Sequence, residues 1–233
     1  MLEDTLKYGL EAMSIPCDGE ALARFRTYYD LLEQRNRVMN LTAINGEDEV
    51  AAKHFLDSAA VLLRFPLAGK TAVDVGSGAG FPGLPLKILV PDLQITLLDA
   101  QQKRVDFLAE VCAALGFDDV RCLHARAEEA AALRESFDFA LARAVARLNV
   151  LSELCLPFVK PGGAFLALKG PAAEEELAEA QRAVKLLGAE AEEVFDYALP
   201  GEDLRHNIVV LRKTAPTPKA YPRRFAQIKK SPL

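Results

Sequence analysis

The sequence contains no apolar run that approaches the ~20 residues a helix needs to cross a bilayer. Residues 1–5 carry acids at the place where a secretion signal has basic side chains. We therefore expect a cytoplasmic protein with reduced thiols and no membrane segment. A zinc site is not expected either, and no other metal is assigned, because no CxxC pair occurs and the three histidines stand at no ligand spacing from the cysteines, Cys17, Cys112, Cys122 and Cys155.

The last 30 residues, from Leu204 to Leu233, contain eight basic residues and no acidic one. The first 203 residues hold 20 basic and 33 acidic side chains, so a net charge of −13 precedes a tail of +8. A chain with an overall charge of −5 is repelled by nucleic acid unless its basic residues cluster. The tail is either a phosphate-binding cluster or only a solubilising segment, and charge alone leaves both open. The candidates for RNA binding are Lys219, Arg223, Arg224, Lys229 and Lys230.

Hydrophobic spacing divides the chain into a helical beginning and a longer alternating part. Apolar residues recur at i, i+3 and i+4 within residues 1–65, which is typical of amphipathic helices. From Lys70, short β-rich runs alternate with helical ones, which predicts βαβ crossovers and a mainly parallel sheet. Strands are expected at residues 72–75, 95–99, 120–124, 137–142, 164–168, 192–197 and 207–212, and helices at 84–89, 103–115, 127–134, 149–158 and 172–187.

The last two expected strands have no helix between them, and the Pro-Gly-Glu-Asp segment at 200–203 favours a turn. We therefore expect an antiparallel hairpin that completes a mixed seven-stranded sheet with helices on both faces, a doubly wound Rossmann-like α/β fold. A further turn is expected at 161–163, before the fifth strand. One domain is predicted, with a helical N-terminal extension (1–65), a cofactor-binding core (66–213) and a basic tail (214–233).

A glycine-rich loop, Gly76-Ser77-Gly78-Ala79-Gly80, directly follows the first expected strand. In a doubly wound sheet this turn lies at the carboxyl edge, where ligands bind, and glycines let a ligand pack against bare backbone. The spacing is G-x-G-x-G, whereas a dinucleotide site needs G-x-G-x-x-G, and the P-loop pattern for ATP is absent. Asp74 precedes the loop by two residues, and a carboxylate there favours a cationic ligand over pyrophosphate. The loop therefore predicts S-adenosylmethionine as cofactor.

Several other candidates stand where later strands end. Asp99 ends the second strand 23 residues after Gly76, which suits an acceptor for ribose hydroxyls, although it also suits a helix cap. Ala127 and Glu128, after the third strand, are candidates for the adenine edge. Arg143 and Lys169 directly follow the fourth and fifth strands and would face the cofactor crevice, although arginines at strand ends are often surface residues.

The segment from Val73 to Leu86, with its Gly80-Phe81-Pro82-Gly83-Leu84-Pro85 continuation, resembles the signature of the bacterial small-subunit ribosomal RNA guanine-N7 methyltransferases, the RsmG or GidB family. The resemblance runs from about Phe25 to the C-terminus. Further segments that resemble the same family are Asn40-Leu41-Thr42-Ala43-Ile44, His54-Phe55-Leu56-Asp57-Ser58, Leu97-Leu98-Asp99-Ala100, residues 103–108 and residues 142–146.

The resemblance implies transfer of a methyl group from S-adenosylmethionine to N7 of one guanosine in the 530 loop of 16S rRNA, leaving S-adenosylhomocysteine. It implies the small ribosomal subunit or its rRNA as partner, and we expect a monomer. The residues on which the cofactor is expected to lie are Asp74, Gly76, Ser77, Gly78, Gly80 and Phe81 for the methionine part, Asp99, Ala100 and Gln101 for the ribose, Ala127 and Glu128 for the adenine, and Arg143 near the methionine end or the RNA.

Guanine N7 has a lone pair and no proton, so attack on the methyl group needs no general base, and none is assigned. The rate should come from positioning and electrostatics. The residues expected to grip the target base are Arg143, Lys169, Asn40 and His54, with a packing role equally open for His54. Two alternatives stay open: a methyltransferase that acts on a small molecule or a protein, and a non-catalytic module that binds NAD.

Overall fold

The computed structural model describes residues 1–201 and 204–233. Seven strands form one sheet in the order β3-β2-β1-β4-β5-β7-β6. The first five strands run parallel, whereas β7 is antiparallel to both β5 and β6. The mixed seven-stranded sheet predicted from the sequence is confirmed. The strands are β1(Thr71–Val75), β2(Gln94–Asp99), β3(Arg121–His124), β4(Phe137–Arg143), β5(Val159–Lys169), β6(Ala189–Ala198) and β7(Arg205–Lys213).

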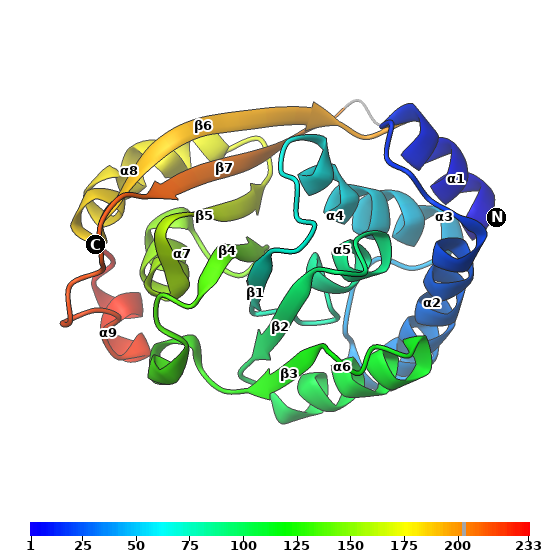
Figure 1. Cartoon of the computed structure of the whole chain (residues 1–233), viewed down its shortest axis with the longest axis horizontal. Coiled ribbons are helices and arrows are strands. Elements are labelled where there is room, and N and C mark those ends of the chain that lie inside the picture. Colours follow the sequence, from blue (N-terminus) through cyan, green and yellow to red (C-terminus); the bar gives the residue numbers. More distant parts are fainter. Residues whose placement is uncertain (202–203) are drawn as a thin grey trace.

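Helices cover both faces of the sheet because side chains alternate between its two sides along each strand (Figure 1). Ala72, Leu97 and Leu141 face a cluster built with the N-terminal helices, α5(Gly83–Leu89) and α6(Gln102–Leu115). Val73, Leu98 and other residues of the opposite side face α7(Leu148–Cys155), α8(Ala173–Leu186) and α9(Phe225–Lys230).

The N-terminal segment is helical, as its spacing predicts, and its apolar stripes are buried in the same cluster as one face of the sheet. The division at residues 65 and 213 stays a prediction. None of the helices in the described ranges is both long and apolar enough to cross a bilayer. The segment comprises α1(Leu2–Ala12), α2(Gly19–Met39), α3(Glu47–Val50), the π-helical turn η1(Ala51–Leu56), α4(Asp57–Ala59) and the 3₁₀ turn η2(Ala60–Leu63).

Two local predictions are wrong. The helix expected over 127–134 is a pair of 3₁₀ turns, η3(Ala127–Glu129) and η4(Ala131–Leu133), because Ala130 between them leaves helical geometry at ψ 45°. The turn expected at 161–163 lies inside β5, where the pairing with β4 shifts register between Phe137 and Phe139. A Cβ at Gly163 would lie 2.4 Å from the carbonyl oxygen of Asp138, so the two backbones approach there too closely for a side chain.

The hairpin between the last two strands is also as predicted, with Tyr197 opposite His206 and Ala198 opposite Arg205. Of the turn expected at 200–203, Glu202 and Asp203 lie outside the described residues. Directly after α7, residues Leu156–Phe158 form a short 3₁₀ turn, so the helix expected over 149–158 ends in a tighter form.

Candidate functional site

The glycine loop leaves β1 at Val75 and enters α5 at Gly83. Its first turn is fixed because the N–H groups of Gly76 and Ser77 both donate to the Leu98 carbonyl oxygen, at 2.8 and 3.1 Å. Gly80 has a φ of +106°, and a Cβ there would lie 2.5 Å from both Leu84 Cδ1 and the Tyr28 hydroxyl. Gly78 has a φ of +59°, but a Cβ there would meet no atom closer than 3.8 Å. Packing therefore requires glycine at position 80, whereas no neighbouring atom crowds the backbone at Gly78.

Asp74 lies directly behind this loop and is completely buried. Its Oδ2 accepts the N–H of Gly83 at 3.0 Å, which ties the end of β1 to the start of α5. Within the described parts of the chain, Oδ1 has no hydrogen-bond partner. Burial raises the pKa of Asp74 from 3.8 to about 7, against the opposing effect of the Gly83 N–H and the positive charge of Arg143. The carboxylate shapes the loop and does not line the cavity in front of it.

Asp99, at the carboxyl end of β2, is 3% exposed and holds the opposite side of the loop. Its Oδ2 accepts the N–H of Gly78 at 3.0 Å, and Oδ1 accepts the N–H of Gln101 at 2.8 Å. Arg104 Nη1 lies 3.5 Å from Oδ2. The N-cap of α6 is Gln101, and among the described residues no side chain makes a capping hydrogen bond there, so the capping alternative for Asp99 is wrong. Each carboxylate oxygen accepts one backbone hydrogen bond and keeps acceptor capacity, and Asp99 lines the cavity described next.

A cavity of about 520 Å³ opens in front of the glycine loop. This volume lies in the range of small-ligand and cofactor sites. The cavity brings together most of the residues expected for the cofactor with several from the N-terminal segment. Its lining residues include Gly76, Ser77, Gly78, Phe81, Asp99, Ala100, Gln101, Arg143, His54, Thr42, Leu41 and Val145.

Arg143, at the end of β4, is held by the N-terminal segment on one wall of this cavity. Its Nη1 donates to Asp57 Oδ2 at 2.8 Å and to the Lys53 carbonyl oxygen at 3.0 Å. Its Nη2 lies 2.9 Å from His54 Nδ1, and its guanidinium lies 4.9 Å from the centre of the Phe81 ring. Asp57 is fixed in turn by Tyr197, whose hydroxyl donates to Oδ1 at 2.7 Å. The guanidinium therefore has little freedom to move.

His54 lies between Arg143 and the loop, with its ring stacked on Phe81 at a centroid distance of 4.3 Å. Burial and the neighbouring Arg143 charge lower the pKa of His54 from 6.5 to about 3, so the ring is neutral near pH 7. Because a guanidinium can only donate, Nδ1 is the acceptor and the proton is on Nε2, which lies 2.7 Å from Thr42 Oγ1. His54 thus positions Arg143 and Thr42 and is not protonated to act as a general acid.

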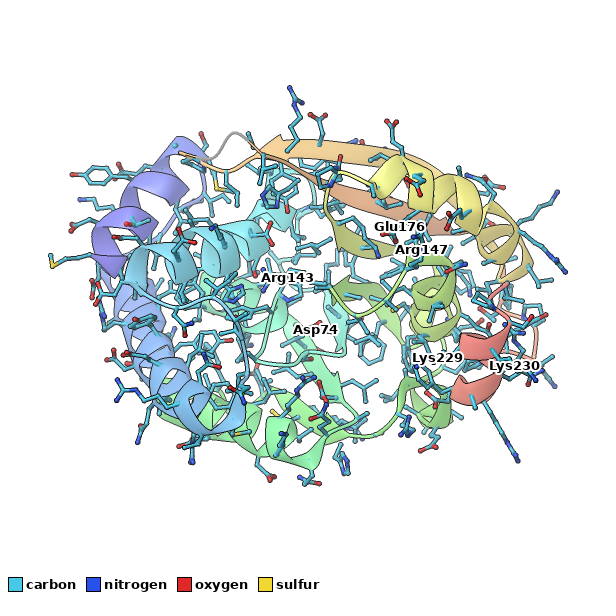
Figure 2. The ribbon with its side chains drawn as sticks, turned by 180° about the vertical axis from the view of Figure 1, so that it is seen from behind. Asp74, Arg143, Arg147, Glu176, Lys229 and Lys230 are labelled. Carbon is cyan, nitrogen blue, oxygen red and sulfur yellow. The ribbon has the colours of Figure 1, made fainter. Side chains whose placement is uncertain are left out.

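A second cavity, of about 560 Å³, adjoins the first along His54, Arg143, Ala144 and Val145. Ala144 adopts a left-handed φ of +55°, and the next residue, Val145, lies against Gly76. The remaining walls of this cavity carry charges of both signs. Figure 2 shows Arg147 and Glu176 beside one another, with Arg143 toward the side of Asp74. Lys53, Arg147, Lys169, Asp57, Glu176, Tyr197 and His206 contribute to the lining.

Several sequence candidates lie outside the first cavity. Asn40 is the left-handed C-cap of α2, and neither cavity includes it in its lining, although the following Leu41 and Thr42 line the first. Ala127 and Glu128 line a separate cavity of about 180 Å³ together with Lys219 and Tyr221. Lys169 lines the second cavity, but its Nζ donates to Glu176 Oε2 at 2.8 Å and to the Ala146 carbonyl oxygen at 2.6 Å.

The basic tail is a packed segment and not a loose extension. Arg223 forms an ion pair of 2.5 Å with Glu153 of α7, whose side chain is fully buried. Arg134 donates to the carbonyl oxygens of Tyr221 and Pro218, at 2.7 and 3.2 Å. Figure 2 shows Lys229 and Lys230 on α9, on the far side of α7 from Arg143. Arg224 and Lys229 line a surface depression with Arg126 and Glu129, away from the glycine loop.

Sequence reasoning did not single out four residues that line the second cavity: Asp57, Tyr197, His206 and Glu176. Asp57 belongs to the segment from His54 to Ser58 that resembles the family, but a single acid on a helix carries no spacing signal. His206 Nδ1 lies 3.0 Å from Asp57 Oδ1, a contact between residues 149 positions apart in the chain. The antiparallel pairing of β7 with β5 and β6 brings that histidine to Asp57 on α4.

Comparison with known proteins shows which family the sequence matches. Residues 21–204 match the family GidB, described as rRNA small subunit methyltransferase G. The chain is similar to ribosomal RNA small subunit methyltransferase G of Clostridium beijerinckii (44% identical, covering 99% of this chain and 98% of the relative) and of Alkaliphilus metalliredigens (46%, 98% and 97%).

Solved structures share the fold at low sequence identity. The structure of M. jannaschii TYW2 in complex with AdoMet is similar with a TM-score of 0.55 and 12% identity, over 67% of this chain and 74% of that one. This likeness confirms the methyltransferase type of Rossmann-like fold. The family match covers most of the chain, and the two curated relatives cover nearly all of it. The chain therefore belongs to the rRNA small subunit methyltransferase G family, GidB.

Proposed function

We propose that this protein transfers a methyl group from S-adenosylmethionine to N7 of a guanosine in the 530 loop of 16S rRNA and releases S-adenosylhomocysteine. The observation that carries the proposal is the pair of adjoining cavities. One is edged by the glycine loop and Asp99, and the other is large enough for a nucleotide base. Arg143 and His54 form the wall that both cavities share.

The residues present fit S-adenosylmethionine. Gly78 exposes bare backbone at the cavity, and a side chain there would occupy the space in front of the loop. Asp99 keeps acceptor capacity for ribose hydroxyls. Asp74, with its unpaired Oδ1, puts a carboxylate behind the loop, and a cationic ligand would favour its ionised form. When bound, the cofactor supplies an electrophilic methyl group.

Because N7 of guanine has no proton to remove, the residues of the chain only position the base and stabilise the transition state. Arg143 is fixed by Asp57 and stacked on Phe81, so it offers a directed positive group at the junction of the cavities. His54 is held neutral and adds no charge to the site. We infer that catalysis rests on alignment of the base against the methyl group and on electrostatic preorganisation.

The partner we propose is the small ribosomal subunit or its rRNA, approached by a monomer in the cytoplasm. In A-form RNA the major-groove edge, which includes N7, is inaccessible to side chains, so the target guanosine must leave its stack. Lys229 and Lys230 are exposed on α9 and, with Lys219 and Arg224, are proposed to meet RNA phosphate. Asn40 is proposed to contact the target base, and Ala127 and Glu128 are proposed to contact the adenine.

The test is to incubate purified protein and S-adenosylmethionine with small subunits that lack the modification, and to map N7-methylguanosine in the 16S rRNA. A single new N7-methyl group in the 530 loop is expected. Methylation elsewhere, or of added protein or small molecules only, would contradict the proposal. Thermal stabilisation by NAD and not by S-adenosylhomocysteine would contradict the cofactor assignment.

A further inference from the structure

Glu176, in the first turn of α8, projects into the second cavity with a fixed orientation. Its Oε2 accepts the backbone N–H of Leu148 at 2.7 Å and the Nζ of Lys169 at 2.8 Å. Within residues 1–201 and 204–233, Oε1 receives no hydrogen bond. The side chain is only 16% exposed, and Lys169 beside it is 7% exposed. One oxygen of a largely buried carboxylate is thus anchored and the other is left for a ligand.

We propose that Oε1 of Glu176 reads the Watson–Crick edge of the target guanine by accepting hydrogen bonds from its N1–H and its 2-amino group. This inference rests on the proposed function and assigns base selection to a residue outside the cofactor site. Guanine is the one RNA base with two adjacent donors on that edge. Adenine and cytosine present a ring nitrogen lone pair to the carboxylate, and uracil flanks its single N–H with two carbonyl oxygens, so each is disfavoured.

The geometry of guanine agrees with the arrangement of the cavities. Its N1 and 2-amino group lie at one end of the purine, and N7 lies toward the other. The second cavity extends from Glu176 and Lys169 to Arg143 and Val145, where it meets the cavity of the glycine loop. A guanine with its Watson–Crick edge at Glu176 therefore directs its imidazole end toward the junction, where the methyl group is expected.

The same contact strengthens as the reaction proceeds. The N7 lone pair forms the new N–C bond, the C–S bond breaks with its electron pair left on sulfur, and no proton leaves the base. The purine thereby becomes cationic, and its N1–H and 2-amino protons become more acidic. A hydrogen bond to a carboxylate gains strength with the acidity of its donor, so Glu176 stabilises the transition state more than the bound substrate.

Glu176→Gln tests the proposal without a change of size. The Leu148 N–H and the Lys169 Nζ both donate to Oε2, so the amide oxygen of the variant should occupy the Oε2 position and its NH₂ group should face the base. The variant then places a hydrogen-bond donor opposite the two donors of guanine. We expect kcat/KM on unmodified small subunits to fall about 10- to 100-fold, with part of the loss in kcat, because a charge-assisted hydrogen bond contributes about 1.5–3 kcal/mol. Glu174→Gln, on the same turn but exposed, is the matched control and should keep full activity.

A second measurement separates recognition from structure. Small subunits reconstituted with inosine at the target position lack only the 2-amino group. Wild-type protein should prefer guanosine to inosine about tenfold, and Glu176→Gln should lose most of that preference while its affinity for S-adenosylhomocysteine is unchanged. Equal rates of wild-type protein on the two substrates would overturn the role of Glu176, whether or not the variant folds. Failure of wild-type protein to methylate the guanosine at all would instead refute the proposed function.

Discussion

The buried carboxyl of Asp74 should make the free energy of unfolding depend on pH. Its carboxyl is fully buried, one oxygen accepts the Gly83 N–H, and the other has no partner in the described part of the chain. Asp74→Asn keeps the shape and the Gly83 hydrogen bond but removes the ionisable proton. The difference in the free energy of unfolding between the two proteins should therefore depend on pH through the titration of Asp74.

The pKa of Asp74 rises on folding from 3.8 to about 7 because burial disfavours its charge. Between these values the folded protein holds the proton and the unfolded chain does not, so Asp74 makes the wild-type protein less stable as pH rises. Each pKa unit corresponds to about 1.36 kcal/mol, which gives a loss of about 4 kcal/mol between pH 4 and pH 8. His54 acts in the opposite direction, because its pKa falls to about 3 and stability is gained as pH rises toward 6.5.

Because these two effects oppose each other, the difference between variant and wild-type protein is the quantity to measure. Urea unfolding at half-unit intervals from pH 4 to pH 8 gives both free energies of unfolding, with all other titrating groups common to the two proteins. The stability of Asp74→Asn relative to wild type should rise by about 4 kcal/mol over this range, with its midpoint of change below pH 7. A difference that stays constant to within 1 kcal/mol would refute the raised pKa and the reasoning from the unpaired oxygen.

Three further changes test other parts of the site. Asp99→Ala should weaken S-adenosylhomocysteine binding about 10- to 100-fold by calorimetry, because charged hydrogen bonds to the ribose are lost, and unchanged affinity would remove Asp99 from the cofactor site. Arg223→Ala leaves the Glu153 carboxylate buried without its partner, so urea unfolding should show a loss of about 3–5 kcal/mol, and a loss below 1 kcal/mol would contradict this. Replacing both Lys229 and Lys230 by Ser should leave that stability unchanged and lower the slope of log affinity for rRNA against log salt by about 1–2, and an unchanged slope would exclude α9 from RNA binding.

The sequence was sufficient for the sheet because short β-rich runs that alternate with helical segments are local signals. Each of the seven expected strands is present, and the loop from Gly76 to Gly80 lies at the carboxyl edge as predicted. The two errors have a local physical cause as well. An alanine-rich segment favours helix by propensity, but Ala130 leaves helical geometry where the chain turns back toward β4. Likewise, Gly162 and Gly163 allow a bulge inside a strand as readily as a turn before it.

The charge-bearing contacts could not be predicted in the same way, because they join residues that only the fold makes neighbours. Asp57 on α4 meets Arg143 from β4 and Tyr197 from β6, which are 86 and 140 positions away along the chain. The tail illustrates the same limit. The last 30 residues carry eight basic side chains, five of which were candidates for one RNA-binding cluster, yet Arg223 among them is paired with a buried carboxylate. The net charge of a segment gives the balance of its basic and acidic groups. Whether the basic groups are available to RNA depends on which acids the fold buries beside them. Removing the whole tail would therefore damage folding and RNA binding together, and only exchange of its exposed lysines can separate the two.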